Sequence, residues 1–339
     1  MAHRVTLIPG DGIGPEITAA TLHVLEATGV RFAWDQQAAG AEAIERRGAP
    51  LPDPAVESIR ATGVALKGPL ATPVGTGHRS VNVALRMAFD LYANIRPVKT
   101  IIPNRCYEDI DLVMVRENTE GLYVGVEHFV AIGDDPRAVA ESTAVVTRQG
   151  CERIVRHAFE YALRHGRSLV TLVHKANILK MASGLFLEAG RAVAKAYEGR
   201  VAFNDRIVDN AAMQLVLHPQ QFDVIVTTNM FGDILSDEMA GLVGGLGLAP
   251  GANIGPKAAI FEAVHGTAPD IAGRGLANPA ALMLSASMML DHLGERDAAE
   301  RVERAVVRSI RDDEVRTHDL GGTATTSEFA EHVATLVRG

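Results

Sequence analysis

Cysteine, tryptophan and long apolar runs are all scarce in this chain of 339 residues. Its two cysteines, Cys106 and Cys151, are too few for a disulfide framework, so a reducing compartment is the simpler expectation. No CxxC pair or Cys/His cluster occurs, which argues against a zinc site built on thiolates. The longest apolar stretches, such as 281–290, are too short to cross a bilayer.

An excess of positive charge is also missing. The formal net charge of −8 argues against nonspecific nucleic-acid binding, which needs a basic field. It leaves room for an anionic substrate, because steering depends on the local charge of a cleft. The chain opens on a strand-like segment, residues 3–8, without the charged and apolar regions of a signal peptide. We therefore expect a cytoplasmic protein that binds neither nucleic acid nor membrane.

Apolar strand-like segments alternate with helical patterns along most of the chain, which predicts an α/β fold. The length allows two domains. Segments 111–116 and 121–128 are expected to pair as strands around a polar turn, residues 117–120. A further strand at 142–147 would belong to an arm that makes dimer contacts. Residues 250–278 are expected to be rich in loops, followed by helices at 279–293 and 296–311.

A glycine-rich motif, Gly10-Asp11-Gly12-Ile13-Gly14, follows the first expected strand. Its spacing is GxGxG rather than the GxGxxG of dinucleotide-binding Rossmann folds, and no suitable acidic partner follows it. A tight turn after the strand is therefore favoured over a Rossmann site.

Eight polar side chains occur in an order that fits one chemistry. Guanidinium forks match carboxylates, aspartate oxygens suit a hard divalent cation, and tyrosine and lysine can move protons. Together they suggest metal-assisted oxidation and decarboxylation of a hydroxy acid. The residues are Arg86, Arg96, Arg116, Tyr123, Lys175, Asp209, Asp233 and Asp237.

Several of these residues also have a structural explanation. Asp233 and Asp237 lie four apart at the start of an expected helix, so they share one face and can hold a cation or complement the helix dipole. Ser80 and Asn82 can donate to a ligand carboxylate at a helix end, whereas Ser80 alone can cap that helix. Salt bridges are the default explanation for the arginines, and packing is the commoner one for Tyr123.

A loop of small residues, His265-Gly266-Thr267-Ala268-Pro269-Asp270, can wrap a nucleotide with its backbone. Asp270 can accept hydrogen bonds from ribose hydroxyls, and its charge would repel a 2′-phosphate. The alternative is an ordinary Pro-Asp turn.

Nine ordered segments resemble the metal-dependent β-decarboxylating dehydrogenases, a family that includes isocitrate, 3-isopropylmalate, homoisocitrate and tartrate dehydrogenases. The resemblance extends over nearly the whole chain. It rests on GDGIGPE, KGPLATPVGTGHRSVNVALR, DLYANIRP, VRENTEGLYVG, VHKANILK, NMFGDILSD, GGLGLAPGANIG, HGTAPDIAGRGLANP and DLGGTATT.

The resemblance implies the isopropylmalate/isocitrate dehydrogenase-like fold, with two α/β domains and a central cleft, which is not a Rossmann fold. Residues 1–98 with 249–339 would form a large, cofactor-side domain. Residues 99–248 would form a small domain with the dimer interface and arm. Family members are dimers or larger, and each cleft takes a lysine and an aspartate from the neighbouring subunit, here Lys175 and Asp209.

The resemblance also implies a role for each residue. Mg²⁺ or Mn²⁺ would lie on Asp233, Asp237 and the neighbour's Asp209. Lys175 would take the substrate hydroxyl proton, and Tyr123 would protonate the enol left after decarboxylation. The residues implied in substrate binding are Ser80, Asn82, Arg86, Arg96 and Arg116, and those implied in cofactor binding are Thr72, His265, Gly266, Thr267, Ala268, Pro269, Asp270, Ile271 and Asn278.

Two further choices concern the ligands. Asp270-Ile271 resembles the NAD-using members, because NADP-using relatives often have Lys-Tyr there. The Ser80-x-Asn82-x-x-x-Arg86 pattern resembles isocitrate enzymes, since small hydrogen-bond donors suit a third carboxylate better than an apolar branch. We expect oxidative decarboxylation of D-isocitrate to 2-oxoglutarate with NAD. The alternatives are homoisocitrate or 3-isopropylmalate as substrate, or a noncatalytic regulatory subunit of a hetero-oligomeric enzyme.

Overall fold

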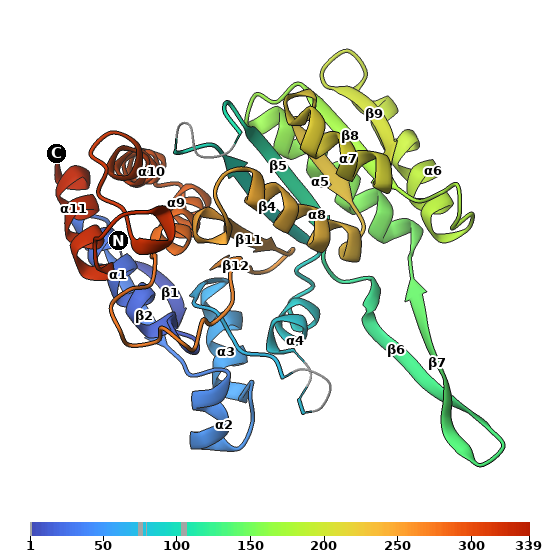
Figure 1. Ribbon diagram of the computed structural model, residues 1–339, viewed down its shortest axis with the longest axis horizontal. Coiled ribbons are helices and arrows are strands. Elements are labelled where there is room, and N and C mark those ends of the chain that lie inside the picture. Colours follow the sequence, from blue (N-terminus) through green and yellow to red (C-terminus); the bar gives the residue numbers. More distant parts are fainter. Residues whose placement is uncertain (1, 74–76, 79, 103–106) are drawn as a thin grey trace. The chain divides into compact units, whose positions relative to one another are not determined.

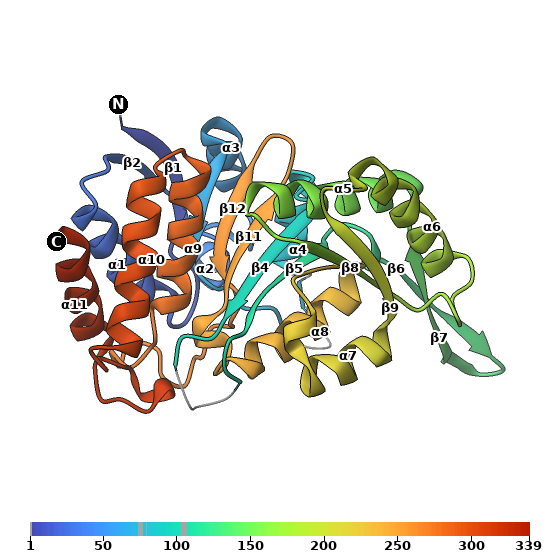
Figure 2. The ribbon, with the colours of Figure 1, turned by 90° about the horizontal axis from the view of Figure 1, so that it is seen from above.

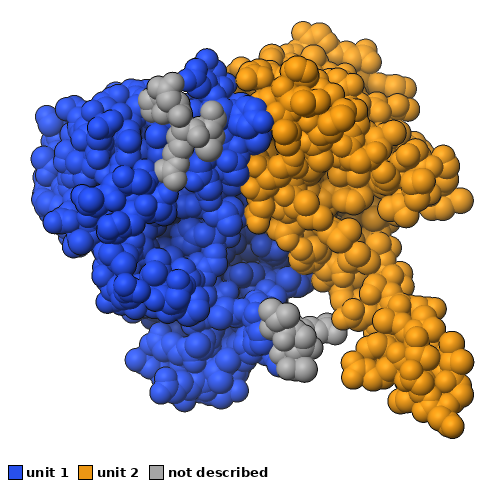
Figure 3. All heavy atoms as spheres, in the orientation of Figure 1, with its two compact units in different colours: residues 1–91, 96–110, 240–339 blue, residues 92–95, 111–239 orange. Residues whose placement is uncertain are grey.

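The computed structural model describes residues 2–73, 77–78, 80–102 and 107–339 (Figure 1). Cys106 and part of the expected loop at 68–77 lie outside the described residues. The chain divides into two compact units, residues 1–91, 96–110 and 240–339 in the first and residues 92–95 and 111–239 in the second (Figure 3). The expected domain boundaries instead placed residues 99–110 and 240–248 in the second domain. Those functional domains remain a prediction.

The first unit combines five strands with seven helices among its described residues. The strands are ordered β2-β1-β3-β12-β11, and every pairing is parallel except β11 with β12. Helix α9 packs on β3, β11 and β12, and α10 lies beside it (Figure 2). The bounds are β1 (His3–Ile8), α1 (Gly14–Ala27), β2 (Phe32–Gln36), α2 (Ala41–Arg47), α3 (Asp53–Thr62), β3 (Val64–Lys67), α4 (Val81–Ala88), β11 (Pro250–Ile254), β12 (Ala259–Ala263), α9 (Ala280–His292), α10 (Arg296–Arg311) and α11 (Thr326–Arg338).

The second unit has a parallel sheet ordered β5-β10-β8-β9. Strands β5, β8 and β10 are almost entirely buried, which explains their nearly continuous apolar sequences. Helices link the successive parallel strands, as such crossovers require. The bounds are β5 (Asp111–Glu117), α5 (Arg148–Arg164), β8 (Leu169–His174), α6 (Ala182–Ala194), β9 (Ala202–Ile207), α7 (Val208–Leu217), β10 (Val224–Thr227) and α8 (Asn229–Leu242). Strand β4 (Ala93–Lys99) and α8 contribute residues to both units.

A separate two-stranded antiparallel sheet, β6 (Gly121–Ile132) with β7 (Asp135–Val145), forms a long hairpin in the second unit (Figure 1). The prediction that 111–116 would pair with 121–128 is wrong. Strand β5 is buried on both faces and pairs in parallel with β10, whereas β6 is largely exposed and pairs with β7. Exposed apolar side chains on the hairpin include Val126, Phe129 and Ile132.

Three elements were not predicted. Strands β11 and β12 fall in the segment expected to be loop-rich, because the glycine, proline and asparagine of β11 are unusual in strands. Helix α11 begins with a capping box in which Thr325 and Glu328 bond each other's backbone N–H.

None of the helices in the described ranges combines the length and apolar character that crossing a bilayer requires.

Candidate active site

Three of the predicted residues meet in the second unit. Arg116, near the end of β5, forms an ion pair through Nη1 with the carboxylate of Asp233 on α8. The hydroxyl of Tyr123, on β6, donates to the other oxygen of that carboxylate at 2.5 Å. The Arg116 guanidinium carbon lies 5.2 Å from the centre of the Tyr123 ring. The positive, negative and proton-carrying groups expected from the sequence are therefore in direct contact.

The structure adds Asn229, which the sequence analysis missed. Its Oδ1 accepts hydrogen bonds from Arg116 Nε at 3.0 Å and Nη2 at 2.7 Å, and its Nδ2 donates to the Glu120 carbonyl at 3.1 Å. The side chain is fully buried. Asn229 lies two residues after Thr227, the last residue of β10, and Thr227 pairs in register with Arg116, so strand pairing brings Asn229 to that arginine. An asparagine at the start of a helix is usually explained as a helix cap, so the sequence alone did not indicate its contact with Arg116.

Lys175 and Asp209 also meet within one chain. Lys175 follows β8, Asp209 lies in the first turn of α7, and the two form an ion pair. The hydrogen bond from Lys175 lowers the pKa of Asp209. The Asp209 side chain remains two-thirds exposed, at 68%. It therefore lies at the surface of the chain.

The donor chemistry of α8 fits a divalent cation. Asp233 and Asp237 lie four residues apart, so their carboxylates share one face of the helix. Asp233 accepts from Arg116 and Tyr123, and carboxylate oxygens are the ligands that a hard divalent cation prefers. Among the described residues of a single chain, no three His, Cys, Asp or Glu side chains gather as a metal site. The expected third ligand, Asp209, would come from a neighbouring subunit.

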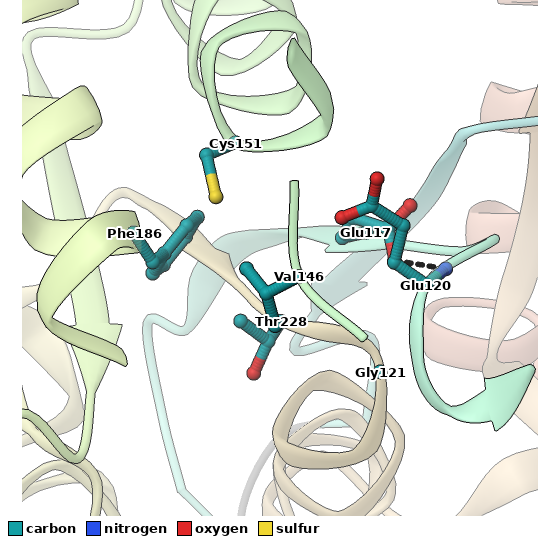
Figure 4. Close-up of a pocket in the computed structure, with 7 residues that line it drawn as sticks. All are labelled: Glu117, Glu120, Gly121, Val146, Cys151, Phe186 and Thr228. Carbon is teal, nitrogen blue, oxygen red and sulfur yellow. Dashed lines mark hydrogen bonds between the residues drawn. The ribbon is translucent and has the colours of Figure 1, made fainter. Parts of the chain in front are cut away.

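The turn between β5 and β6 is ordered by a buried carboxylate. Glu117 accepts hydrogen bonds from the backbone N–H groups of Thr119 at 2.9 Å and Glu120 at 2.8 Å. Burial raises the pKa of Glu117 despite these donors. A small pocket here is lined by Glu117, Glu120, Gly121, Val146, Cys151, Phe186 and Thr228 (Figure 4). Burial raises the pKa of the Cys151 thiol to about 12, so this cysteine is not a nucleophile.

In the first unit, α4 carries the predicted Ser80–Arg86 pattern. Ser80 caps the helix by accepting from the Val83 N–H at 3.5 Å, and Thr72 donates to Ser80 Oγ at 3.3 Å. Asn82 Oδ1 and Arg86 Nε are buried and have no hydrogen-bond partner within the described part of the chain. They lie four residues apart, so they share one face of the helix. Arg96, on β4, is also buried.

A buried ion pair lies in the same unit. Lys67 Nζ contacts Glu262 Oε2 at 2.5 Å and donates to the Gly68 carbonyl at 2.8 Å. Asn253 donates to Glu262 Oε1 at 2.7 Å. Burial alone would raise the pKa of Glu262, but the nearby charges of Lys67 and Arg86 outweigh it and hold this pKa at about 2. Glu262 is therefore a carboxylate at any physiological pH.

The predicted nucleotide loop, residues 265–271, is also in the first unit. Its Thr267 carbonyl accepts from the Ile13 N–H at 2.9 Å, which joins the loop to the glycine-rich motif. The Asp270 side chain is exposed. The His265 ring is more enclosed, and burial lowers its pKa. Asn278 follows the loop, and its Nδ2 donates to Asp319 at 2.9 Å.

The glycine-rich motif itself forms a tight turn that is fixed from several directions. Asp11 accepts from the N–H of Ala41 at 2.8 Å and of Ala71 at 2.9 Å. Gly12 has φ +57°, and a Cβ there would lie 2.1 Å from the Thr267 carbonyl oxygen. These contacts agree with the tight-turn interpretation, and the turn connects the loop of Thr72 with the predicted nucleotide loop.

Comparison with known proteins now decides the family. The model of the isocitrate/isopropylmalate dehydrogenase family matches residues 4–333. The chain belongs to this family. A catalytic subunit 5 of mitochondrial NAD isocitrate dehydrogenase from Arabidopsis thaliana is 47% identical over 330 residues, covering 97% of this chain and 87% of the relative. The mitochondrial NAD isocitrate dehydrogenase subunit alpha of Homo sapiens is 47% identical over 338 residues, covering 98% and 90%.

Among solved structures, the fold matches that of isocitrate dehydrogenase from Methylococcus capsulatus. The TM-score is 0.96 at 58% sequence identity, and the match covers 99% of this chain and all of that one. The predicted α/β fold of this family is therefore confirmed.

Proposed function

We propose that this protein oxidises D-isocitrate with NAD and releases CO₂ to give 2-oxoglutarate. The observation that carries the choice of substrate is the face of α4, where the buried Asn82 Oδ1 and Arg86 Nε have no partner within the described chain. A buried polar group without a partner is costly, so this face favours a ligand that completes its hydrogen bonds. A third carboxylate can accept from the Arg86 Nε–H, which an apolar branch would leave unpaired, whereas the Asn82 Oδ1 is itself an acceptor and needs a donor group.

The residues of the second unit suit the proton transfers of this reaction. Lys175 takes the proton of the substrate hydroxyl, and Tyr123 returns one to the carbon that loses CO₂. Arg86, Arg96 and Arg116 would hold substrate carboxylates. Asp233, Asp237 and a neighbour's Asp209 would hold Mg²⁺ or Mn²⁺, which supplies Lewis-acid polarisation of the hydroxyl oxygen when bound.

The cofactor assignment rests on charge. Thr72, the loop 265–271 and Asn278 would bind the dinucleotide, and NAD would accept the hydride. Asp270 is exposed and carries a carboxylate. A 2′-phosphate beside it would be repelled, so NAD is favoured over NADP.

The proposed oligomeric state rests on the family resemblance, and the proposed location rests on the scarcity of cysteine. We infer a homodimer or larger assembly in which Lys175 and Asp209 serve the neighbour's site, in a cytoplasmic setting. The two curated relatives carry the word mitochondrial in their names, and they are called subunits. The competing possibility, a noncatalytic regulatory subunit, predicts that the purified chain is inactive alone.

The test is initial-rate NAD reduction by the purified chain with Mn²⁺, comparing D-isocitrate with homoisocitrate and 3-isopropylmalate. Fast turnover of isocitrate alone is expected. A preference for either homologue would keep the mechanism and reject the substrate assignment. No turnover with any of the three substrates would favour the hypothesis that the chain is a noncatalytic regulatory subunit.

A further inference from the structure

We propose that Asn229 and Gly232 are positioning residues that fix the Arg116 guanidinium for a substrate carboxylate. This inference deepens the proposed function and rests on the role given there to Arg116. Arginine binds carboxylates best through a planar fork, so the orientation of its plane decides how well the fork matches.

The Asn229 side chain contacts one edge of the Arg116 guanidinium. Arg116 Nε and Nη2, one edge of the guanidinium, both donate to Asn229 Oδ1, at 3.0 and 2.7 Å. An acceptor shared by two N–H groups of one edge fixes the plane of the group. Asn229 cannot rotate its amide without loss, because Nδ2 donates to the Glu120 carbonyl at 3.1 Å. Both residues are buried, Asn229 at 0% and Arg116 at 1% exposure.

The second observation is a gap that only glycine leaves. A Cβ at Gly232 would lie 2.6 Å from Arg116 Cγ and 2.8 Å from its Cβ, which are distances that packed atoms do not reach. These are the near atoms of the arginine stem rather than its mobile end, so Arg116 itself would have to move. Gly232 therefore lets the stem of Arg116 cross α8.

Asn229 and Gly232 contact Arg116 from the same face of α8. Asn229, Gly232 and Asp233 occupy positions i, i+3 and i+4 of α8, which places them on one face. Asn229 holds one edge of the guanidinium, Gly232 accommodates its stem, and Asp233 pairs with Nη1. The same helix face thus orients the arginine and presents the aspartates proposed to hold the metal.

The first experiment compares two variants with matched controls. Asn229→Ala removes the shared acceptor, and Gly232→Ala displaces the stem while raising helix propensity. We expect each to raise KM for isocitrate by roughly tenfold, the scale of one lost charge-assisted hydrogen bond, with KM for NAD changed less than about twofold. The controls are Asn204→Ala, whose Oδ1 has no hydrogen-bond partner among the described residues, and Gly241→Ala on α8, where a Cβ meets nothing within 4 Å. An unchanged KM for isocitrate, or equal rises in both KM values, would overturn the proposal.

A double-mutant cycle separates positioning from general damage. In an Arg116→Lys background the fork is gone, so Asn229→Ala should raise KM for isocitrate no further. An equal rise in both backgrounds would show that Asn229 does not act through Arg116. If the parent chain does not turn over isocitrate, the proposed function fails. The same double-mutant cycle is then measured by urea unfolding, which tests the contact between Asn229 and Arg116 without activity. If the losses of unfolding free energy are additive, the proposal is rejected.

Discussion

Replacing Glu262 with glutamine is expected to lower the free energy of unfolding by about 3 kcal/mol. Lys67 and Glu262 are both buried, and their charges are 2.5 Å apart. Glutamine keeps the size of the side chain and an acceptor for Asn253, but it places an NH2 group instead of a charged acceptor opposite the Lys67 ammonium. What it leaves is a buried ammonium whose counter-ion is missing, which is far costlier than losing an exposed ion pair.

The magnitude follows from the pKa of Glu262. The ordinary value is 4.5, and the folded value is about 2. At roughly 1.4 kcal/mol per pKa unit, the difference amounts to about 3 kcal/mol. Because the folded pKa is lowered, this stability is fully present above pH 4.5 and is lost as the pH falls toward about 2. The range found when one partner of a buried pair is removed, about 3–5 kcal/mol, agrees.

The assay is urea unfolding near neutral pH, followed by circular dichroism, on the parent, Glu262→Gln, Lys67→Met and the double variant. The matched control is Glu303→Gln, since Glu303 pairs with Lys99 at 3.8 Å with both side chains about half exposed. The control should change the unfolding free energy by less than about 0.5 kcal/mol. The double variant should cost less than the two single losses together. A loss below about 1 kcal/mol in Glu262→Gln, or strict additivity, would refute the reasoning.

Three further outcomes are expected. Burial lowers the pKa of His157 to about 4 from 6.5, so the unfolded chain binds this proton more readily and stability falls as pH drops between these values. Between pH 6.5 and pH 4 the urea midpoint of His157→Gln should fall less than that of the parent chain. Equal falls in the two proteins would contradict the assignment. Lys175→Met should abolish NAD reduction while isocitrate still binds by calorimetry; near-normal turnover would remove Lys175 from its role. Exchanging Asp270-Ile271 for Lys-Tyr should shift the ratio of kcat/KM values toward NADP, and an unchanged ratio would reject the charge argument.

Strong local patterns made the fold class predictable. Buried parallel strands such as β10 read as short apolar runs, and α10 was placed at 296–311 with its observed bounds. Strand partners were harder, because pairing depends on contacts distant in sequence. Segment 121–128 was paired with its neighbour in sequence, although β6 turns away after Glu117 and pairs with β7.

The candidate site was predictable where a residue type announces its chemistry. Charged residues such as Arg116 and Asp233 stood out, and the structure brings them into contact. Asn229 did not, because an amide at a helix start has a sufficient local explanation. Its role follows from the register of β5 with β10, which no short stretch of sequence encodes. The metal and substrate roles themselves remain predictions.

The first unit is built from both ends of the chain, and this has a consequence during synthesis. Strand β3 pairs with β12, so Leu66 lies opposite Phe261, and Glu16 accepts from the Ala277 N–H. At about 5–20 residues per second, β3 therefore waits on the order of ten seconds or more for its partner. Most of the second unit, residues 111–239, is one continuous stretch that is complete before β12 emerges. The N-terminal strands are thus the part of the nascent chain whose edges stay open longest to aggregation.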